Sequence, residues 1–224
     1  MPAELLITGD GSHTVCIPEL NVTYHSKHGA IQESMHVYIE SGLKQIQNKK
    51  ISVLEVGFGT GLNALLTYIQ AEKNDLEVIY EAVELHHLDD SLTAALNYLS
   101  VLEAPQYVNA FSNMHACEWN VLQTISPSFA FKKVTGDIRD MSLTGSYNLV
   151  YYDAFDPSAQ PDVWTSTIFH KIYSAMEEEG MLVTYCSKTS VRKALVEAGF
   201  QVVKIPGPKG KREIVKALKA RDGF

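Results

Sequence analysis

Three glycines at every second position, Gly57, Gly59 and Gly61, follow an apolar run and precede a helical pattern. Glycine permits positive φ angles and a close approach of the backbone to a ligand. The spacing G-x-G-x-G differs from the dinucleotide fingerprint G-x-G-x-x-G, and no Lys-Ser/Thr pair follows as in a phosphate-binding P-loop. The pattern therefore favours a ligand pressed flat against the loop over a pyrophosphate, and a plain tight turn is the alternative.

Two acidic residues follow later apolar runs. Glu84 ends VIYEAVE, where a carboxylate can accept hydrogen bonds from both hydroxyls of a ribose, and Glu81 is its rival inside the same run. Asp137 closes VTGD, where it can bond the exocyclic amine of an adenine. The alternatives are a solvated acid and an Asp-capped turn. Together with the glycine loop these residues predict an adenosine pocket without phosphate binders, which is what S-adenosylmethionine (SAM) requires.

A third acidic stretch, DAFDP, begins at Asp153 after another apolar run. Methyl transfer from a sulfonium is an in-line displacement, so an enzyme has mainly to align a nucleophile and remove its proton. An amine acceptor arrives largely protonated, and a carboxylate can hold its ammonium group and help it to lose the proton. Asp153 is the first candidate for that catalytic contact, Asp156 is the second, and Phe155 can stack on an aromatic acceptor. The alternatives are that Asp156 only caps a turn and that Phe155 packs in the core.

The elements expected to position these residues alternate from residue 51 onward. The sequence predicts strands at 51–57, 76–85, 129–137, 147–155 and 181–187, and helices at 61–73, 88–100, 112–123, 161–179 and 188–198. Strands separated by helices imply a parallel sheet covered on both faces. The last two strands, at 200–205 and 212–218, are joined by so short a connection that they can pair only as an antiparallel hairpin.

The first fifty residues predict a small extension. Residues 5–17 are typical of a hairpin that turns at Gly9-Asp10-Gly11, and apolar residues between 31 and 46 have helical spacing. Because residues 1–50 can bury little core alone, we expect them to pack on a domain formed by residues 51–224. The predicted fold class is α/β, and it resembles the Rossmann-like fold of class I SAM-dependent methyltransferases, with a mostly parallel seven-stranded sheet and a C-terminal antiparallel hairpin.

Composition argues against several kinds of protein. The 224 residues carry a formal charge of −7, contain no run of 18 apolar residues and begin without the features of a signal peptide, so we expect a cytoplasmic protein that does not cross a membrane. Cys16, Cys117 and Cys186 lie far apart, and no CxxC pair or histidine cluster accompanies them. We therefore expect neither disulfide bonds nor a metal site.

Charge is unevenly distributed along the chain. From Lys188 onward ten basic residues oppose three acidic ones, so this segment carries +7 and the first 187 residues carry −14. Lys209, Lys211 and Arg212 concentrate part of that charge around the turn GPKGK. Such a segment can dock a polyanion, and the alternative is that its lysines only keep exposed helices soluble.

Several motifs together resemble one family. GFGTGLN at 57–63, DAFDPSAQPDVWT at 153–165, Val191-Arg192 with AGF at 198–200, and GPKGKRE at 207–213 are similar to the methyltransferase domain of the bifunctional tRNA 5-methylaminomethyl-2-thiouridine biosynthesis protein (MnmC/MnmD type). The N-terminal part resembles the same family through Tyr24, Ser26, Glu33, His36 and Val37. The likeness spans nearly the whole chain, and KRE together with the DAFDP motif is more diagnostic than the glycine loop.

The resemblance implies SAM-dependent methylation of the primary amine of 5-aminomethyl-2-thiouridine at the tRNA wobble position. It implies that the glycine loop and Glu84 hold SAM, that Asp137 meets the adenine, that Glu33 closes over the methionine end and that Asp153 faces the acceptor amine. The basic turn with Lys209, Lys211 and Arg212 would then contact tRNA phosphates, while the anticodon loop presents the uridine.

The chain departs from the family pattern in two respects. The family usually has Asp-Gly-Phe-Ala-Pro, whereas this chain has Ala154 and Asp156, so we expect an altered acceptor pocket. No FAD-dependent oxidase part follows Phe224, so we expect no FAD binding. The aminomethyl substrate would then come from another enzyme, such as a separate oxidase or an upstream wobble-uridine modification enzyme.

Two other functions stay open at the level of sequence. One is a class I methyltransferase that acts on a small-molecule or protein amine, in which the basic tail is incidental. The other is a non-catalytic SAM- and tRNA-binding module that keeps the fold as a scaffold. An NAD-linked oxidoreductase is disfavoured, because the loop spacing differs and no Tyr-x-x-x-Lys motif is present.

Overall fold

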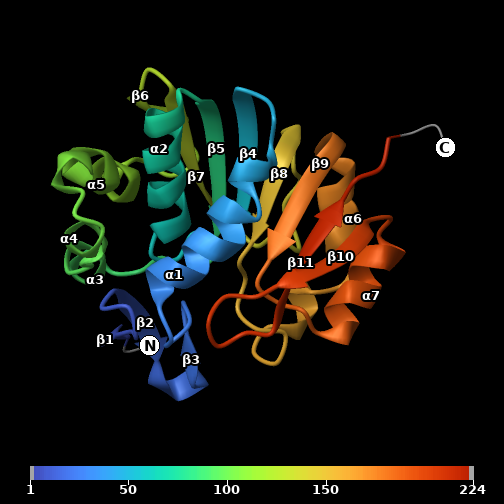
Figure 1. The fold of residues 1–224 in the computed structure, drawn as a ribbon, viewed down its shortest axis with the longest axis horizontal. Helices are drawn as coiled ribbons and strands as arrows, with labels where there is room; N and C mark the ends of the chain where they lie inside the picture. The colour runs from blue at the N-terminus through green and yellow to red at the C-terminus, as the bar shows by residue number, and fades with distance from the viewer. Residues whose placement is uncertain (1–2, 222–224) are drawn as a thin grey trace.

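A central eight-stranded sheet organises the computed structural model, which describes residues 3–221 (Figure 1). Its strands are β4 (Lys50–Val56), β5 (Glu77–Glu84), β6 (Gln123–Ser126), β7 (Phe129–Thr135), β8 (Tyr147–Tyr152), β9 (Met176–Thr184), β10 (Gln201–Pro206) and β11 (Glu213–Leu218). They lie in the order β10-β11-β9-β8-β4-β5-β7-β6.

The inner ladders of this sheet are parallel. β4 pairs with β5 and β8, β5 pairs with β7, and β8 pairs with β9. β10 and β11 form the expected antiparallel hairpin, and β11 also runs antiparallel to β9. From β4 the chain builds outward through β5 and β7, and it later builds β8 and β9 on the other side. The strand order therefore reverses between β4 and β8, the place where open α/β sheets bind ligands.

Helices cover both faces of the sheet. They are α1 (Ala30–Ser34), α2 (Leu62–Asn74), α3 (Asp90–Ala94), α4 (Tyr98–Val101), α5 (Val108–Ala116), α6 (Ser166–Ser174) and α7 (Thr189–Glu197). Shorter helical segments are η1 (Pro18–Leu20), the π-helical η2 (Met35–Glu40), η3 (Leu43–Gln45), η4 (Pro105–Tyr107) and η5 (Pro161–Val163). Figure 1 shows α1 and α2 in front of the sheet and α6 and α7 at the side of the C-terminal hairpin.

Alternate residues of the inner strands build two separate cores. Successive side chains of a strand point to opposite faces of a sheet. In β8, Leu149 and Tyr151 accordingly pack in the cluster that includes α2, whereas Val150 and Tyr152 pack in the cluster that includes α6 and α7. Because β8 is buried on both faces, the polar residues that follow it are held in place by a rigid support.

The N-terminal extension forms a second, three-stranded sheet, drawn below the central one in Figure 1. The predicted hairpin is confirmed as β1 (Glu4–Ile7) and β2 (His13–Ile17), and β3 (Val22–Thr23) is added to it. Asn97 ties this hairpin to the core: its side chain accepts a hydrogen bond from His13 N at 2.8 Å and donates one to Gly11 O at 2.9 Å. Asn97 also lies where the helix predicted at 88–100 divides into α3 and α4.

The helix predicted at 112–123 is wrong in its second half. α5 ends at Ala116, and residues 123–126 form β6, which pairs antiparallel with β7. The sheet therefore has eight strands rather than the seven predicted. β6 is a short edge strand without a fully buried residue, so its sequence lacks the apolar alternation by which a half-buried strand is recognised.

The helix predicted at 161–179 also ends early. α6 stops at Ser174, and β9 already begins at Met176, which is 3% exposed and pairs with Tyr147. Burial of the Met176 side chain in the sheet outweighs the helix propensity of the three glutamates that follow it. These glutamates are exposed, and Glu179 has a φ angle of 61°, so the strand is irregular where they occur.

Candidate active site

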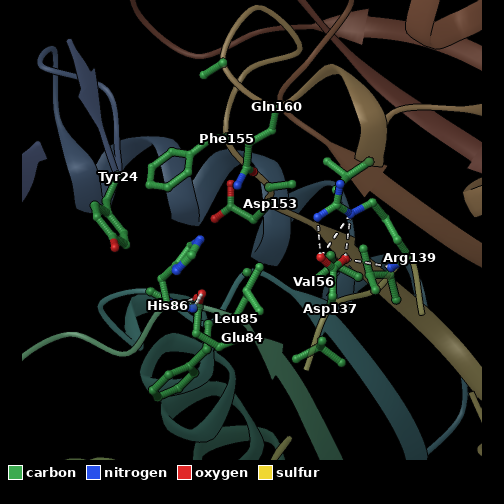
Figure 2. A pocket seen from close by; sticks show the side chains of 18 of the residues that line it. Tyr24, Val56, Glu84, Leu85, His86, Asp137, Arg139, Asp153, Phe155 and Gln160 are labelled. Carbon is green, nitrogen blue, oxygen red and sulfur yellow. Dashed lines mark hydrogen bonds and ion pairs between the residues drawn. The ribbon is translucent and has the colours of Figure 1, made fainter. Parts of the chain in front are cut away.

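A cavity of about 290 Å³ opens at the carboxyl ends of the strands, where the strand order reverses. Its walls include residues 56–60 at the end of β4, 83–86 at the end of β5, 136–139 after β7, and 153–155 with 159–163 after β8. Figure 2 shows Glu84, Asp137 and Asp153 reaching it from three different loops. Glu84, Asp137 and Asp153, which the sequence predicted to meet in one pocket, therefore line one cavity.

The glycines of the loop are required by its geometry. Gly57 has a φ angle of 96°, and a Cβ atom there would lie 2.6 Å from the carbonyl oxygen of Asp153. Gly59 has a φ angle of 51°, and its Cβ would lie 2.7 Å from the ring of Tyr24. Gly61 starts α2 as its N-cap and does not line the cavity. Positions 57 and 59 thus require glycine, because two neighbouring segments touch the backbone of the loop there.

Glu84 is bonded to the glycine loop as well as facing the cavity. Its Oε2 accepts a hydrogen bond from Gly59 N at 2.9 Å, and its Oε1 accepts one from His86 N at 2.8 Å. The remaining lone pairs of the carboxylate are free to accept from a ribose. The rival Glu81 is held elsewhere, by the hydroxyl of Tyr147 at 3.0 Å. The structure therefore favours Glu84 over Glu81 as the ribose acceptor.

Asp137 is clamped by a residue that the sequence reasoning missed. Arg139 Nε lies 3.0 Å from Oδ1 and 2.9 Å from Oδ2 of Asp137, and the Arg139 backbone N donates to Oδ1 at 2.8 Å (Figure 2). These hydrogen bonds from Arg139 lower the pKa of Asp137, so the carboxylate stays charged. Since Arg139 uses its side chain in this way, its charge is compensated inside the cavity instead of being offered to a phosphate.

Asp153 directly follows β8, and its side chain is held by two hydrogen-bond donors. The hydroxyl of Tyr38 donates to its Oδ1 at 2.6 Å, and the side-chain amide of Asn63 donates to its Oδ2 at 2.8 Å. Loss of solvent around the carboxyl raises its pKa to about 7, even though both hydrogen bonds oppose that change. Asp153 is thus oriented on a rigid strand and divides between its charged and neutral forms near physiological pH.

A second carboxyl group lies underneath Asp153. The Asn63 amide that donates to Asp153 also donates to Glu55 Oε1 at 2.9 Å, and Tyr80 donates to Glu55 Oε2 at 2.9 Å. Glu55 is fully buried in β4, and burial raises its pKa well above the ordinary value. Burial thus favours the neutral form of Glu55, because a buried charge without a cation beside it is costly.

The N-terminal extension supplies one wall of the cavity. Tyr24 packs edge-to-face on Phe155, with ring centroids 4.9 Å apart, and both line the cavity (Figure 2). His25 Nε2 lies 2.7 Å from the hydroxyl of Thr60 in the glycine loop. Burial lowers the pKa of His25 to about 4, so it is neutral at physiological pH. The extension thus takes part in the site and does more than cover the core.

Comparison with known proteins decides the family. A family model described as S-adenosyl-L-methionine-dependent methyltransferase matches residues 103–220, more than half of the chain. The chain belongs to this methyltransferase family. Its fold agrees with that membership: the crystal structure titled MNMC2 from Aquifex aeolicus superposes with a TM-score of 0.78 at 28% identity, covering 98% of this chain and 71% of that one.

Curated relatives of the methyltransferase are longer. A protein of Burkholderia thailandensis named tRNA 5-methylaminomethyl-2-thiouridine biosynthesis bifunctional protein MnmC is 29% identical over 231 residues, covering 96% of this chain and 35% of the relative. A Burkholderia mallei protein of the same name is 30% identical with the same coverage. The chain thus spans about a third of the length of these relatives. A spermidine synthase of Thermotoga maritima, at 13% identity and a TM-score of 0.53, shares the fold alone.

The residues of the cavity fit SAM, the cofactor of the family. Gly57 and Gly59 line the cavity with their backbone and carry no side chain, which suits a ligand lying against the backbone. Glu84 faces the cavity as a hydrogen-bond acceptor, as a ribose requires, and Asp137 neutralises Arg139 beside it. Among residues 3–221 no group of three or more His, Cys, Asp or Glu is placed to hold a metal ion, and no helix is long and apolar enough to span a membrane.

Glu33, expected over the methionine end, does not line this cavity. Its Oε1 accepts from Ser26 N at 2.9 Å, and its Oε2 forms an ion pair with Lys211 Nζ at 2.5 Å. The same ammonium lies over the ring of Tyr185, 3.9 Å from the centroid. Of the basic residues expected on one turn, Lys209 and Arg212 are exposed, whereas Lys211 points inward.

Asp156 behaves as the turn cap that the sequence offered as its alternative. Its Oδ1 accepts from Ser158 N at 2.8 Å and pairs with Lys188 Nζ at 2.5 Å. Burial raises the pKa of Asp156, but the hydrogen bonds from Lys188 and Ser158 outweigh it, and the net pKa is lowered. Asp156 also lies outside the lining of the cavity, so it is placed to shape the loop around Phe155.

Besides Arg139, sequence reasoning missed the residues that orient Asp153. Tyr38 occurs in an apolar helical pattern, where a tyrosine is expected to pack. Asn63 and Glu55 did carry a signal: a glutamate inside the apolar run VLEVG and an asparagine at the start of an otherwise apolar helix are both unusual for buried positions. A buried polar residue needs a partner, and here the partners are one another.

Proposed function

We propose that this methyltransferase transfers a methyl group to the primary amine of 5-aminomethyl-2-thiouridine at the wobble position of tRNA, which yields 5-methylaminomethyl-2-thiouridine. The names of the Burkholderia relatives and the likeness to the Aquifex structure support this substrate. The observation that carries the proposal is the environment of Asp153, a carboxyl group at the cavity with a pKa of about 7.

Asp153 has the properties that methylation of an amine requires. When SAM is bound, it supplies a sulfonium methyl group, whose S–C bond breaks as the new N–C bond forms. A primary ammonium has no lone pair for this attack until it loses a proton. A carboxylate whose conjugate acid has a pKa of about 7 takes that proton roughly 10³-fold more favourably than one at the ordinary 3.8. Tyr38 and Asn63 keep the carboxylate aimed while it does so.

Other residues of the site would bind SAM and the acceptor. Glu84 and the loop at Gly57 and Gly59 would hold the adenosine part of SAM, while the packed rings of Tyr24 and Phe155 form an aromatic wall of the cavity. Phe155 also offers an aromatic surface to the uracil ring of the acceptor. Lys209 and Arg212, exposed on the turn between β10 and β11, would contact phosphates of the anticodon loop without reading its sequence. An enzyme that makes the aminomethyl group, such as an oxidase or another wobble-uridine modification enzyme, would act before this step.

The test is methyl transfer from labelled SAM to tRNA that carries 5-aminomethyl-2-thiouridine, with the product nucleoside identified by mass spectrometry. Asp153→Asn should bind SAM nearly as the parent does and lower the rate by about 10²-fold or more. Asp75→Asn, a surface substitution of the same kind, should leave the rate unchanged. Turnover of small or protein amines but not of tRNA would instead support a different acceptor, and SAM binding without turnover on any acceptor would support a scaffold.

A further inference from the structure

The turn between β10 and β11 folds back onto the N-terminal extension. His36 Nε2 lies 2.8 Å from the carbonyl oxygen of Pro206, and Gly210 packs so closely on the ring of His28 that a Cβ atom would lie 2.2 Å from it. Lys211, at the end of this turn, is thereby directed into the molecule. Its ammonium lies 2.5 Å from Glu33 Oε2 and 3.9 Å from the ring centroid of Tyr185.

The two groups that surround this ammonium are held independently of it. The other carboxylate oxygen of Glu33 accepts from Ser26 N at 2.9 Å, and the hydroxyl of Tyr185 donates to Ala154 O at 2.8 Å. The side chain of Glu33 is 9% exposed, so a negative charge there requires a cation beside it. Glu33 and Tyr185 thus form a preformed cation site, which Lys211 reaches from a turn by its flexible stem.

This cation site adjoins the catalytic carboxylate. Tyr185 bonds the residue that directly follows Asp153 in sequence, and Tyr38, which donates to Asp153, interacts electrostatically with Glu33 and Tyr185. The charge of Glu33 raises the pKa of Asp153, whereas that of Lys211 lowers it. All of these groups therefore belong to one cluster around Asp153.

We propose that Glu33 and Tyr185 form the binding site for the ammonium group of the methyl acceptor, and that Lys211 fills this site as an internal mimic when no acceptor is bound. The ligand class is a primary ammonium on a methylene carbon, which the lysine side chain itself presents. A carboxylate and the face of an aromatic ring are the groups that recognise such a cation. The inference rests on the proposed function, because it assigns the acceptor of that reaction.

Two ammonium groups cannot occupy the site together, because two positive charges in contact with the same carboxylate and ring would repel each other. An acceptor must therefore displace Lys211. Its apparent affinity is the intrinsic affinity multiplied by the fraction of molecules in which the site is open. A nucleic-acid acceptor compensates for this displacement, because its phosphates attract the released ammonium. A free nucleoside has no phosphate, so nothing offsets the free energy of displacing Lys211. Lys211 would in this way favour tRNA over small amines.

The experiment compares the parent chain with Lys211→Met, which keeps an apolar stem and removes the ammonium. Free 5-aminomethyl-2-thiouridine and tRNA that carries it are the two acceptors. We expect Lys211→Met to raise kcat/KM for the nucleoside by about fivefold or more, mainly through a lower KM, and to lower kcat/KM for tRNA. Lys204→Met is the matched control. Lys204 lies in β10, next to the turn, and the substitution removes its surface ion pair with Glu213.

An unchanged or lower kcat/KM of Lys211→Met on the nucleoside, with the parent active on tRNA, would overturn the inference and leave the proposed function standing. Inactivity of the parent on both acceptors would instead remove the proposed function. Glu33→Gln gives a second test: it keeps the volume and removes the charge, so it should raise KM for the nucleoside while the Kd for SAM stays the same. A changed Kd for SAM with an unchanged KM for the nucleoside would mean that Glu33 binds SAM and would contradict the assignment. Thermal unfolding of each variant with SAM verifies that it is folded.

Discussion

The hydroxyl of Tyr38 lies 2.6 Å from Oδ1 of Asp153, so a residue of the N-terminal extension donates a hydrogen bond to the carboxyl group that follows β8. The other oxygen of Asp153 is held by Asn63, at the start of α2. Two segments that are far from Asp153 in the sequence therefore fix its side chain. The carboxyl group of Asp153 is therefore oriented before any ligand arrives, which is the preorganisation that the proposed proton transfer needs.

Tyr38→Phe should move the pH dependence of the reaction. If Asp153 takes the proton of the acceptor as proposed, its base form is the active one, so kcat/KM should rise with pH through about 7 and then level off. The Tyr38 hydrogen bond favours the charged carboxylate, and its loss raises the pKa of Asp153 further. We therefore expect the rising limb of the profile to lie at higher pH in Tyr38→Phe. A limb that stays in place or moves to lower pH would contradict this role, and Tyr147→Phe, which loses a similar bond to Glu81, is the control.

Glu55→Gln should change how stability depends on pH. Burial raises the pKa of Glu55 in the folded chain, so folding retains a proton that the unfolded chain loses above its own pKa of about 4.3. The free energy of unfolding should therefore fall as pH rises above that value, by at most about 1.4 kcal/mol per pH unit from this group. Asp153 adds a slope of the same sign up to about pH 7.

Glutamine resembles the neutral form of Glu55 and cannot lose a proton. Urea unfolding between pH 5 and 8 should therefore show a shallower decline for Glu55→Gln than for the parent, while the slope due to Asp153 remains in both. Glu178→Gln, at an exposed position, should follow the parent. Parallel curves for parent and Glu55→Gln would show that Glu55 is charged in the folded chain.

Gly57→Ala should weaken both folding and SAM binding. The substitution places a Cβ atom 2.6 Å from the carbonyl oxygen of Asp153 at a φ angle of 96°. Gly11→Ala separates the two causes, because Gly11 has a similar φ angle of 84° but no heavy atom within 4 Å of the added Cβ. We expect a loss of about 1 kcal/mol in Gly11→Ala and clearly more, about 3 kcal/mol, in Gly57→Ala. Chemical unfolding and calorimetric titration with SAM measure these effects, and equal losses would mean that the contact with Asp153 has no cost.

Lys209→Glu combined with Arg212→Glu should weaken tRNA binding and leave the Kd for SAM unchanged. Both side chains are exposed on the β10–β11 turn, away from the cavity lining. Loss of two phosphate contacts should make the slope of log K against log salt shallower by about 1 to 2. Lys73→Glu, on the exposed side of α2, is the control for a general change of charge. Identical tRNA binding curves at low and moderate salt would remove this turn from the tRNA contact surface.

Residues with a local cause were predictable from sequence. The strand–helix alternation, the glycine loop and the acids at strand ends follow from short patterns, and the carboxyl ends of parallel strands meet at one edge by necessity. β6 escaped prediction because it is a short edge strand without a fully buried residue, and the start of β9 escaped because pairing with Tyr147 of β8 decides it. Arg139 escaped as well, since an arginine two residues after an aspartate has no distinguishing pattern.

Residues defined by distant partners were not predictable. Tyr38 and Asn63 meet Asp153 across 115 and 90 positions of the chain, and no local spacing encodes such meetings. Lys211 shows the reverse error: its place among basic residues suggested a surface role, whereas the fold of its turn directs it to Glu33. Charge along a sequence indicates how much charge a segment carries, but not the direction in which each side chain points.

The contact of His36 with Pro206, 170 positions apart, has a consequence for synthesis of the protein. The N-terminal extension cannot meet Lys211 until β10 and β11 have been synthesised and have folded back against it. A nascent chain that lacks this hairpin therefore leaves the buried carboxylate of Glu33 without its cation.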